Sequence, residues 1–127
     1  TEKQKKHLPP GITGISRTES AEELAQLYSA ADVFVNPTWE DNYPTTNLEA
    51  ISCGTQVVTY RTGGSPESVT EGNGLVVEKG NLEQLASAIR KVEKTPNTCR
   101  KYALSHFRRE DRFNDYIKLY DRLLQKQ

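Results

Sequence analysis

The stretch PTWEDNYPTTNLEAISCG, residues 37–54, decides the fold that the sequence predicts. It lies between two apolar segments, residues 32–35 and 56–60, which have the composition of buried β-strands. Pro44 suits the first turn of a helix, where the missing N–H of proline costs nothing, and Gly54 suits the position just past the helix end. The stretch therefore predicts an acidic loop and a short helix that connect two neighbouring strands.

The predicted helix has a polar face with an anion-binding end. Thr45 and Thr46 would carry backbone N–H groups without intrahelical acceptors, and the helix dipole favours negative charge at that end. Glu49 and Ser52 share a face with Thr45 by their spacing, so a carboxylate would lie one turn beyond the free N–H groups. Leu48 is expected to point into the core. This arrangement suits a ligand that has a phosphate beside a polyol.

Strands and helices alternate along the rest of the chain, which predicts an α/β fold with a parallel, doubly wound sheet. The expected strands are residues 12–16, 32–35, 56–60 and 75–77, and the expected helices begin near Ser20, Pro44, Asn81, Tyr102 and Glu110. Ser20 and Glu23 have the spacing of a capping box, and Tyr28 lies on the apolar stripe of the helix that follows. The last helix has an apolar face that needs a partner.

The composition indicates one domain without a bias toward nucleic acid. The chain has 127 residues, of which 17 are basic and 17 are acidic. Residues 1–80 carry a net charge of −5 and residues 81–127 a net charge of +5. The C-terminal part is therefore either a set of solvated helices or a basic face that lies near an anionic membrane or an acidic glycan.

Other features favour a cytoplasmic setting. No apolar run approaches the ~20 residues of a membrane span, and the first residues do not resemble a signal peptide. Cys53 and Cys99 have no metal-site spacing, and two lone thiols indicate a reducing compartment without a disulfide. The chain contains no Met, so we expect it to be part of a longer protein.

The central segment resembles a known enzyme family. Residues 31–69, ADVFVNPTWEDNYPTTNLEAISCGTQVVTYRTGGSPESV, are similar to the nucleotide-sugar-binding half of the retaining glycosyltransferases called group 1, or family 4. Those enzymes carry two acidic residues with seven residues between them, as Asp41 and Glu49 have here. The run Glu-Asp-Asn-Tyr-Pro-Thr at residues 40–45 resembles the subgroup that builds bacterial capsule, exopolysaccharide and lipopolysaccharide glycans.

The resemblance implies a fold and a domain organisation. Enzymes of this family have two Rossmann-like halves (the GT-B fold), and residues 1–127 would be a partial C-terminal, donor-binding half. Such a half has the strand order 3-2-1-4-5-6, and this chain supplies strands that resemble 3, 4, 5 and 6. We therefore expect either abnormal pairing of the strand at residues 12–16 or association of two chains through an exposed sheet edge.

The resemblance also assigns roles to the central residues. Glu49 would bind the ribose hydroxyls, the amides of Thr45 and Thr46 would bind the diphosphate, and Asp41 would reach the transferred sugar. The family usually has Glu at the position of Asp41, so Glu40 is a candidate to replace it. Catalysis is thus assigned to Asp41 and Glu49, with Glu40 as the alternative.

Further donor-binding candidates lie around this core, and three of them have a second interpretation. They are Arg17, Tyr43, Pro44, Gly63 and Gly64. Arg17 would follow the strand at residues 12–16 and contact the base or phosphate, unless it only pairs with a nearby Glu. The two glycines would form either a ligand-facing loop or a tight turn.

Trp39 has two interpretations of the same kind. It is the only Trp of the chain. It would either line a sugar site or cover the core.

The predicted reaction is transfer of a sugar, with retention, from a nucleoside-diphosphate sugar such as a UDP-sugar to a growing surface glycan or lipid-linked acceptor. No Asp-x-Asp motif occurs, so we expect neither a metal nor another cofactor. The parent enzyme would work in the cytoplasm, at the inner face of the membrane, and this chain alone would be inactive. Two alternatives stay open, namely a nucleotide-sugar 2-epimerase and a non-catalytic Rossmann-like interaction module.

Overall fold

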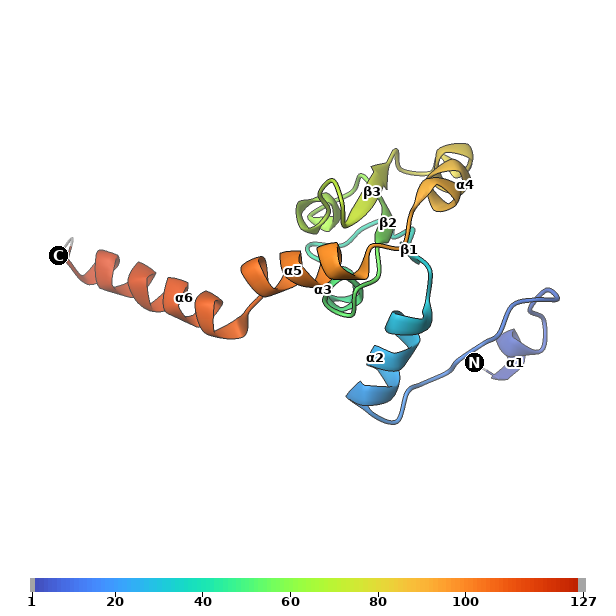
Figure 1. The fold of residues 1–127 in the computed structure, drawn as a ribbon, viewed down its shortest axis with the longest axis horizontal. Helices are drawn as coiled ribbons and strands as arrows, with labels where there is room; N and C mark the ends of the chain where they lie inside the picture. Colours follow the sequence, from blue (N-terminus) through green and yellow to red (C-terminus); the bar gives the residue numbers. More distant parts are fainter. Residues whose placement is uncertain (1, 126–127) are drawn as a thin grey trace.

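The computed structural model describes residues 2–125, which form a small parallel sheet flanked by helices (Figure 1). In chain order the elements are α1 (Glu2–Lys5), α2 (Ala21–Ala30), β1 (Phe34–Asn36), α3 (Thr45–Ser52), β2 (Val57–Tyr60), the 3₁₀ turn η1 (Ser65–Ser68), β3 (Gly74–Val77), α4 (Leu82–Lys91), α5 (Pro96–His106) and α6 (Arg109–Leu124). Thr1, Lys126 and Gln127 lie outside the described residues. The predicted α/β class is confirmed.

The sheet has the order β1-β2-β3, with both pairs parallel. All four residues of β2 are buried, because this strand is central and has helices on both faces. Val57 packs with Ala50 and Ile51 of α3, whereas the neighbouring Val58 packs on the opposite face with Ala88 of α4. The chain therefore has two small apolar cores, one on each side of the sheet, as a doubly wound fold requires.

Local signals fix α3 between β1 and β2. Pro44 is buried and immediately precedes the first helical residue, one position earlier than the sequence predicted. Gly54 adopts a φ of 90°, which ends the helix in a conformation that favours glycine. The guanidinium of Arg100 in α5 donates a 2.7 Å hydrogen bond to the carbonyl of Ser52 in the last turn. The C-terminal end of α3 is thus satisfied by protein groups.

The predicted capping signals of the other helices are also present. The backbone N–H of Glu23 donates to the Ser20 hydroxyl, 3.1 Å away, at the start of α2. The N–H of Gln84 donates to the Asn81 side chain, 2.9 Å away, at the start of α4. Each interaction satisfies one of the free N–H groups of a helix start.

The strand predicted at residues 12–16 does not form. This segment is irregular and lies between α1 and α2, and the side chains of Ile12 and Ile15 are 56% and 55% exposed. The two isoleucines are three residues apart, so they would point to opposite faces of a strand, and Gly14 between them weakens a strand further. The prediction was wrong because two apolar residues were taken as a strand without a matching alternation.

The C-terminal helix α6 extends away from the sheet (Figure 1). None of its residues is buried. Its exposed large apolar side chains are Phe113, Tyr116, Ile117, Leu119, Tyr120, Leu123 and Leu124. The predicted apolar face therefore has no partner among the described residues. No helix in this part of the chain is both long and apolar enough to cross a membrane.

The open edge of β1 allows a test of the predicted association between chains. The N–H of Phe34 donates to the carbonyl of Gln56, 2.8 Å away, so the backbone groups of Val35 point away from β2. We expect concentration-dependent dimerisation in sedimentation experiments. The substitution Val35→Pro should weaken it, because proline removes the outward N–H. A chain that stays monomeric at millimolar concentration, or a dimer that Ile117→Glu in α6 abolishes and Val35→Pro does not, would contradict this prediction.

Candidate functional site

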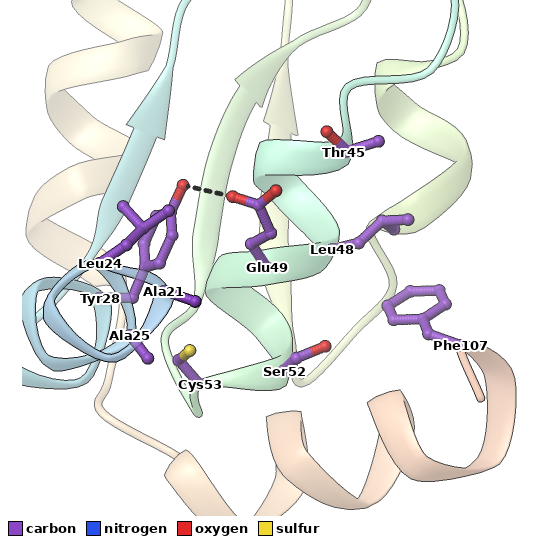
Figure 2. A pocket seen from close by; sticks show the side chains of 10 residues that line it. All are labelled: Ala21, Leu24, Ala25, Tyr28, Thr45, Leu48, Glu49, Ser52, Cys53 and Phe107. Atoms are coloured by element: carbon purple, nitrogen blue, oxygen red, sulfur yellow. Dashed lines mark hydrogen bonds between the residues drawn. The ribbon is translucent and has the colours of Figure 1, made fainter. Parts of the chain in front are cut away.

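A groove of about 450 Å³ lies between α2 and α3 (Figure 2). Its lining residues are Ala21, Leu24, Ala25, Tyr28, Thr45, Leu48, Glu49, Ser52, Cys53 and Phe107. Thr45, Glu49 and Ser52 line it together, in agreement with their predicted position on one face of the helix. Most of the other lining side chains are apolar, so the carboxylate of Glu49 stands out as the only charged group of the groove.

Glu49 has a protein partner that the sequence did not reveal. The hydroxyl of Tyr28 in α2 donates a hydrogen bond to Oε2 of Glu49 across the groove, 3.1 Å away (Figure 2). Burial, followed by this hydrogen bond and the negative charge of Glu49, raises the pKa of Tyr28 to about 12. Tyr28 remains a neutral donor at physiological pH. On the sequence it was only one position of an apolar stripe, and nothing in the pattern indicated a polar role.

The N-terminal end of α3 lies at the same groove, at Thr45. No side chain caps this end, and its first turn carries no acidic residue. The N–H of Asn47 bonds to the carbonyl of Pro44, 3.1 Å away, but the amides of Thr45 and Thr46 have no acceptor among the described residues. Both threonines are exposed. Two backbone donors and the positive end of the helix dipole are therefore open to solvent.

The acidic loop packs against the glycine pair. The N–H of Gly64 donates to the carbonyl of Asp41, 3.2 Å away, and the carboxylate of Asp41 accepts from the N–H of Tyr43, 3.0 Å away. A Cβ atom at Gly63 or Gly64 would overlap the backbone oxygen of Asp41 or Asn42, respectively. Gly63 also has a φ of 48°. The glycines thus permit a close approach to the chain's own loop, which favours the tight-turn interpretation.

A buried ring of hydrogen bonds lies beneath these loops. The side-chain amide of Asn36 donates to Oδ1 of Asn47 at 2.9 Å, and the amide of Asn47 donates to the hydroxyl of Ser65 at 3.0 Å. The hydroxyls of Ser65 and Thr59 are 2.7 Å apart, and Thr59 donates to the carbonyl of Asn36 at 2.8 Å. Asn47, Thr59 and Ser65 are fully buried. The ring therefore connects the ends of β1 and β2 to α3 and η1.

The remaining predicted residues do not share the groove. Arg17 is exposed in the irregular segment before α2, and the strand that would have brought it to the sheet edge is absent. Glu40 is exposed in the acidic loop. Trp39 is 63% exposed and packs edge-on against Tyr60, with ring centroids 6.4 Å apart, so it covers the core only at its margin.

Tyr43 faces a second groove, which Glu67, Tyr102 and Arg112 also line. Burial is the main cause that raises the pKa of Tyr43. Leu48 lines both grooves and is only half-buried, which corrects the expectation that it points into the core. The core-facing positions of α3 are Asn47, Ala50 and Ile51. The sequence pattern missed Asn47 because a polar residue inside a helix is usually exposed.

These features, a Rossmann-like sheet with an uncapped helix end and a carboxylate one turn further, can be compared with known proteins. The profile of the family described as "Glycosyl transferases group 1" matches residues 1–125. The chain belongs to this family. A solved structure, the sucrose-phosphate synthase of Thermosynechococcus elongatus, superposes with a TM-score of 0.73 and 29% identity over 84% of this chain and 29% of that protein. The sheet and its helices therefore match part of the GT-B fold.

Curated relatives support the same family. The chain is 40% identical over 72 residues to a D-inositol 3-phosphate glycosyltransferase of Corynebacterium jeikeium, which covers 56% of this chain and 17% of the relative. It is 36% identical over 90 residues to the enzyme of the same name from Saccharomonospora viridis, which covers 68% of this chain and 21% of the relative. The chain thus spans about a fifth of these relatives. The expected capsule and exopolysaccharide subgroup finds no support in these names.

Removal of the Asn47 amide should destabilise the fold. Asn47→Ala removes the acceptor of the half-buried Asn36 amide and one hydrogen bond to the buried hydroxyl of Ser65, so we expect a loss of about 2–3 kcal/mol in the free energy of unfolding. Urea denaturation followed by the fluorescence of Trp39 would measure it. Asn97→Ala, at an exposed position in the first turn of α5, should change stability by less than about 0.5 kcal/mol. Equal stabilities of the two variants would contradict the role given to the buried ring.

Proposed function

We propose that this chain binds the nucleoside-diphosphate sugar donor of a group 1 glycosyltransferase. The observation that carries the proposal is the juxtaposition of the free amides of Thr45 and Thr46 with the carboxylate of Glu49 on one short helix. Residues four apart on a helix lie about 5–6 Å from each other. A diphosphate and the adjacent ribose have comparable spacing between their charged and hydroxyl groups.

Each group of this site complements a different part of the donor. The amides of Thr45 and Thr46 would donate to diphosphate oxygens, and the helix dipole would stabilise their negative charge. The carboxylate of Glu49 would accept hydrogen bonds from the two ribose hydroxyls. Tyr43 and Pro44 shape the loop before the helix, and Gly63 with Gly64 supports that loop from behind. Arg17 would join the site only if the segment at residues 12–16 moves toward the sheet.

The chemical step is proposed to retain the configuration of the transferred sugar. The bond between the anomeric carbon and the phosphate oxygen breaks, and the acceptor oxygen forms the new bond on the same face. The departing phosphate takes the proton of the acceptor hydroxyl. Asp41 is the candidate to contact the sugar, with Glu40 as its alternative, and no metal ion is part of the proposal. One oxygen of Asp41 already accepts from Tyr43, so the other is available for the sugar.

The acceptor is proposed for the full-length parent protein, not for this chain alone. A growing surface glycan, or a lipid-linked acceptor at the inner face of the membrane, is our proposal from residues 40–45 alone. The named relatives act on inositol phosphate or produce sucrose phosphate by their names. A direct assay therefore has to offer both classes of acceptor.

Nucleotide binding is the first test of the donor site. We expect UDP or GDP, titrated into the isotope-labelled chain, to shift the amide resonances of Thr45 and Thr46 and the side-chain resonances of Glu49. Glu49→Ala should weaken binding about tenfold or more, because it removes a charge-assisted acceptor. The nucleotide that binds more tightly would identify the preferred base.

The matched control is Glu83→Ala, which removes an exposed glutamate from the first turn of α4 on the other face of the sheet. This variant should bind nucleotide as the unmodified chain does. Shifts that are spread over the chain without a centre at Thr45 and Thr46, or no shift at millimolar nucleotide, would contradict the proposed phosphate site.

Product analysis of the full-length parent separates transfer from epimerisation. We expect a new glycosidic product and free nucleoside diphosphate when the donor is incubated with a surface-glycan precursor. Inositol phosphate serves as the competing acceptor. An altered sugar that is still attached to its nucleotide, in the absence of any acceptor, would instead identify an epimerase.

A further inference from the structure

Tyr28 is fixed at both its backbone and its ring. Its side chain is 9% exposed, and its ring packs edge-on against Phe34 at a centroid distance of 5.3 Å. Its carbonyl accepts hydrogen bonds from the hydroxyl of Thr55 and the N–H of Ala31. The phenol hydroxyl is the one polar group of this side chain, and it donates a hydrogen bond to Glu49 in the groove (Figure 2).

Glu49, by contrast, is exposed, and its side chain can adopt several rotamers. Its carboxylate is separated from the backbone by three rotatable bonds, and Tyr28 is the only side chain that donates a hydrogen bond to it among residues 2–125. That bond uses Oε2, so Oε1 has no protein donor in this part of the chain. An exposed glutamate without such an anchor would sample several rotamers and would lose that freedom each time a ligand binds.

We propose that Tyr28 is a positioning residue that holds the carboxylate of Glu49 in the orientation that receives ligand hydroxyls. The hydroxyl of Tyr28 occupies one oxygen and leaves the other for a vicinal diol. This inference rests on the proposed function in naming the ligand as a nucleotide, whereas the effect of Tyr28 on Glu49 does not depend on any ligand.

A conservative variant isolates this role. Tyr28→Phe retains the ring that packs against Phe34 and removes only the hydroxyl, so the core cluster of α2 and α3 is preserved. Tyr60→Phe is the matched control, because Tyr60 is 3% exposed and its hydroxyl makes no hydrogen bond among the described residues. Both variants should unfold at the same temperature as the unmodified chain, within a few degrees.

The first experiment is a double-mutant cycle on nucleotide affinity. UDP and GDP are titrated into the unmodified chain, Tyr28→Phe, Glu49→Ala and the double variant. We expect Tyr28→Phe to weaken the tighter nucleotide about fivefold to tenfold, and to have no effect when Glu49 is already Ala. Tyr60→Phe should bind normally. An equal loss in both backgrounds, or no loss in either, would overturn the proposal.

A second measurement decides the proposal without a ligand. Side-chain scalar couplings and methylene relaxation of Glu49 report how many rotamers it populates. We expect one dominant rotamer in the unmodified chain and in Tyr60→Phe, and averaging among several in Tyr28→Phe. Identical averaging in all three would overturn the positioning role. Failure of both nucleotides to bind the unmodified chain would instead refute the proposed function, and the rotamer result would then stand alone.

Discussion

The positions of two loops, the acidic loop that follows β1 and the glycine-containing loop that precedes η1, depend on the hydrogen bonds of the Asn47 side chain. A fully buried amide is costly to remove from water unless its donors and acceptor are satisfied, and here they are satisfied by groups from β1 and η1. Asn47 lies between Thr46 and Glu49 on the same helix. The groups of α3 that face the groove are therefore positioned by a neighbour that faces the interior and makes buried polar contacts.

The two ends of α3 are treated in opposite ways. At the C-terminal end, Gly54 turns the chain and Arg100 donates to the last turn, so the carbonyls there have protein partners. At the N-terminal end, Pro44 offers no capping side chain and two amides stay open. Helices α2 and α4 have a capping side chain at this end, whereas α3, α5 and α6 have none. The open end of α3 lies at the groove that the carboxylate of Glu49 also lines.

Helix α3 and the two strands beside it could be predicted from the sequence. The helix at α3 is bounded by Pro44 and Gly54, whose conformational limits act locally, and the adjacent strands are apolar runs that only a covered sheet accepts. The strand prediction at residues 12–16 was wrong because strand formation depends on a partner strand, which the local sequence does not specify. Tyr28 contacts Glu49, which is 21 positions away in the sequence, and Asn47 contacts Ser65, which is 18 positions away. Such contacts arise from tertiary packing and have no local signature.

Helix α6 extends away from the sheet, and this affects the thermal unfolding of the chain. The helix has 16 residues, and none of them is buried, so its stability comes from its own hydrogen bonds and a few surface ion pairs. An isolated helix of that length is marginal in water, whereas the sheet and its helices are stabilised by two packed cores. Helical signal should therefore fade at temperatures where the sheet is still intact. Heat capacity and ellipticity would then describe two separate transitions, and a two-state fit to either would underestimate the cooperativity of the packed sheet and its helices.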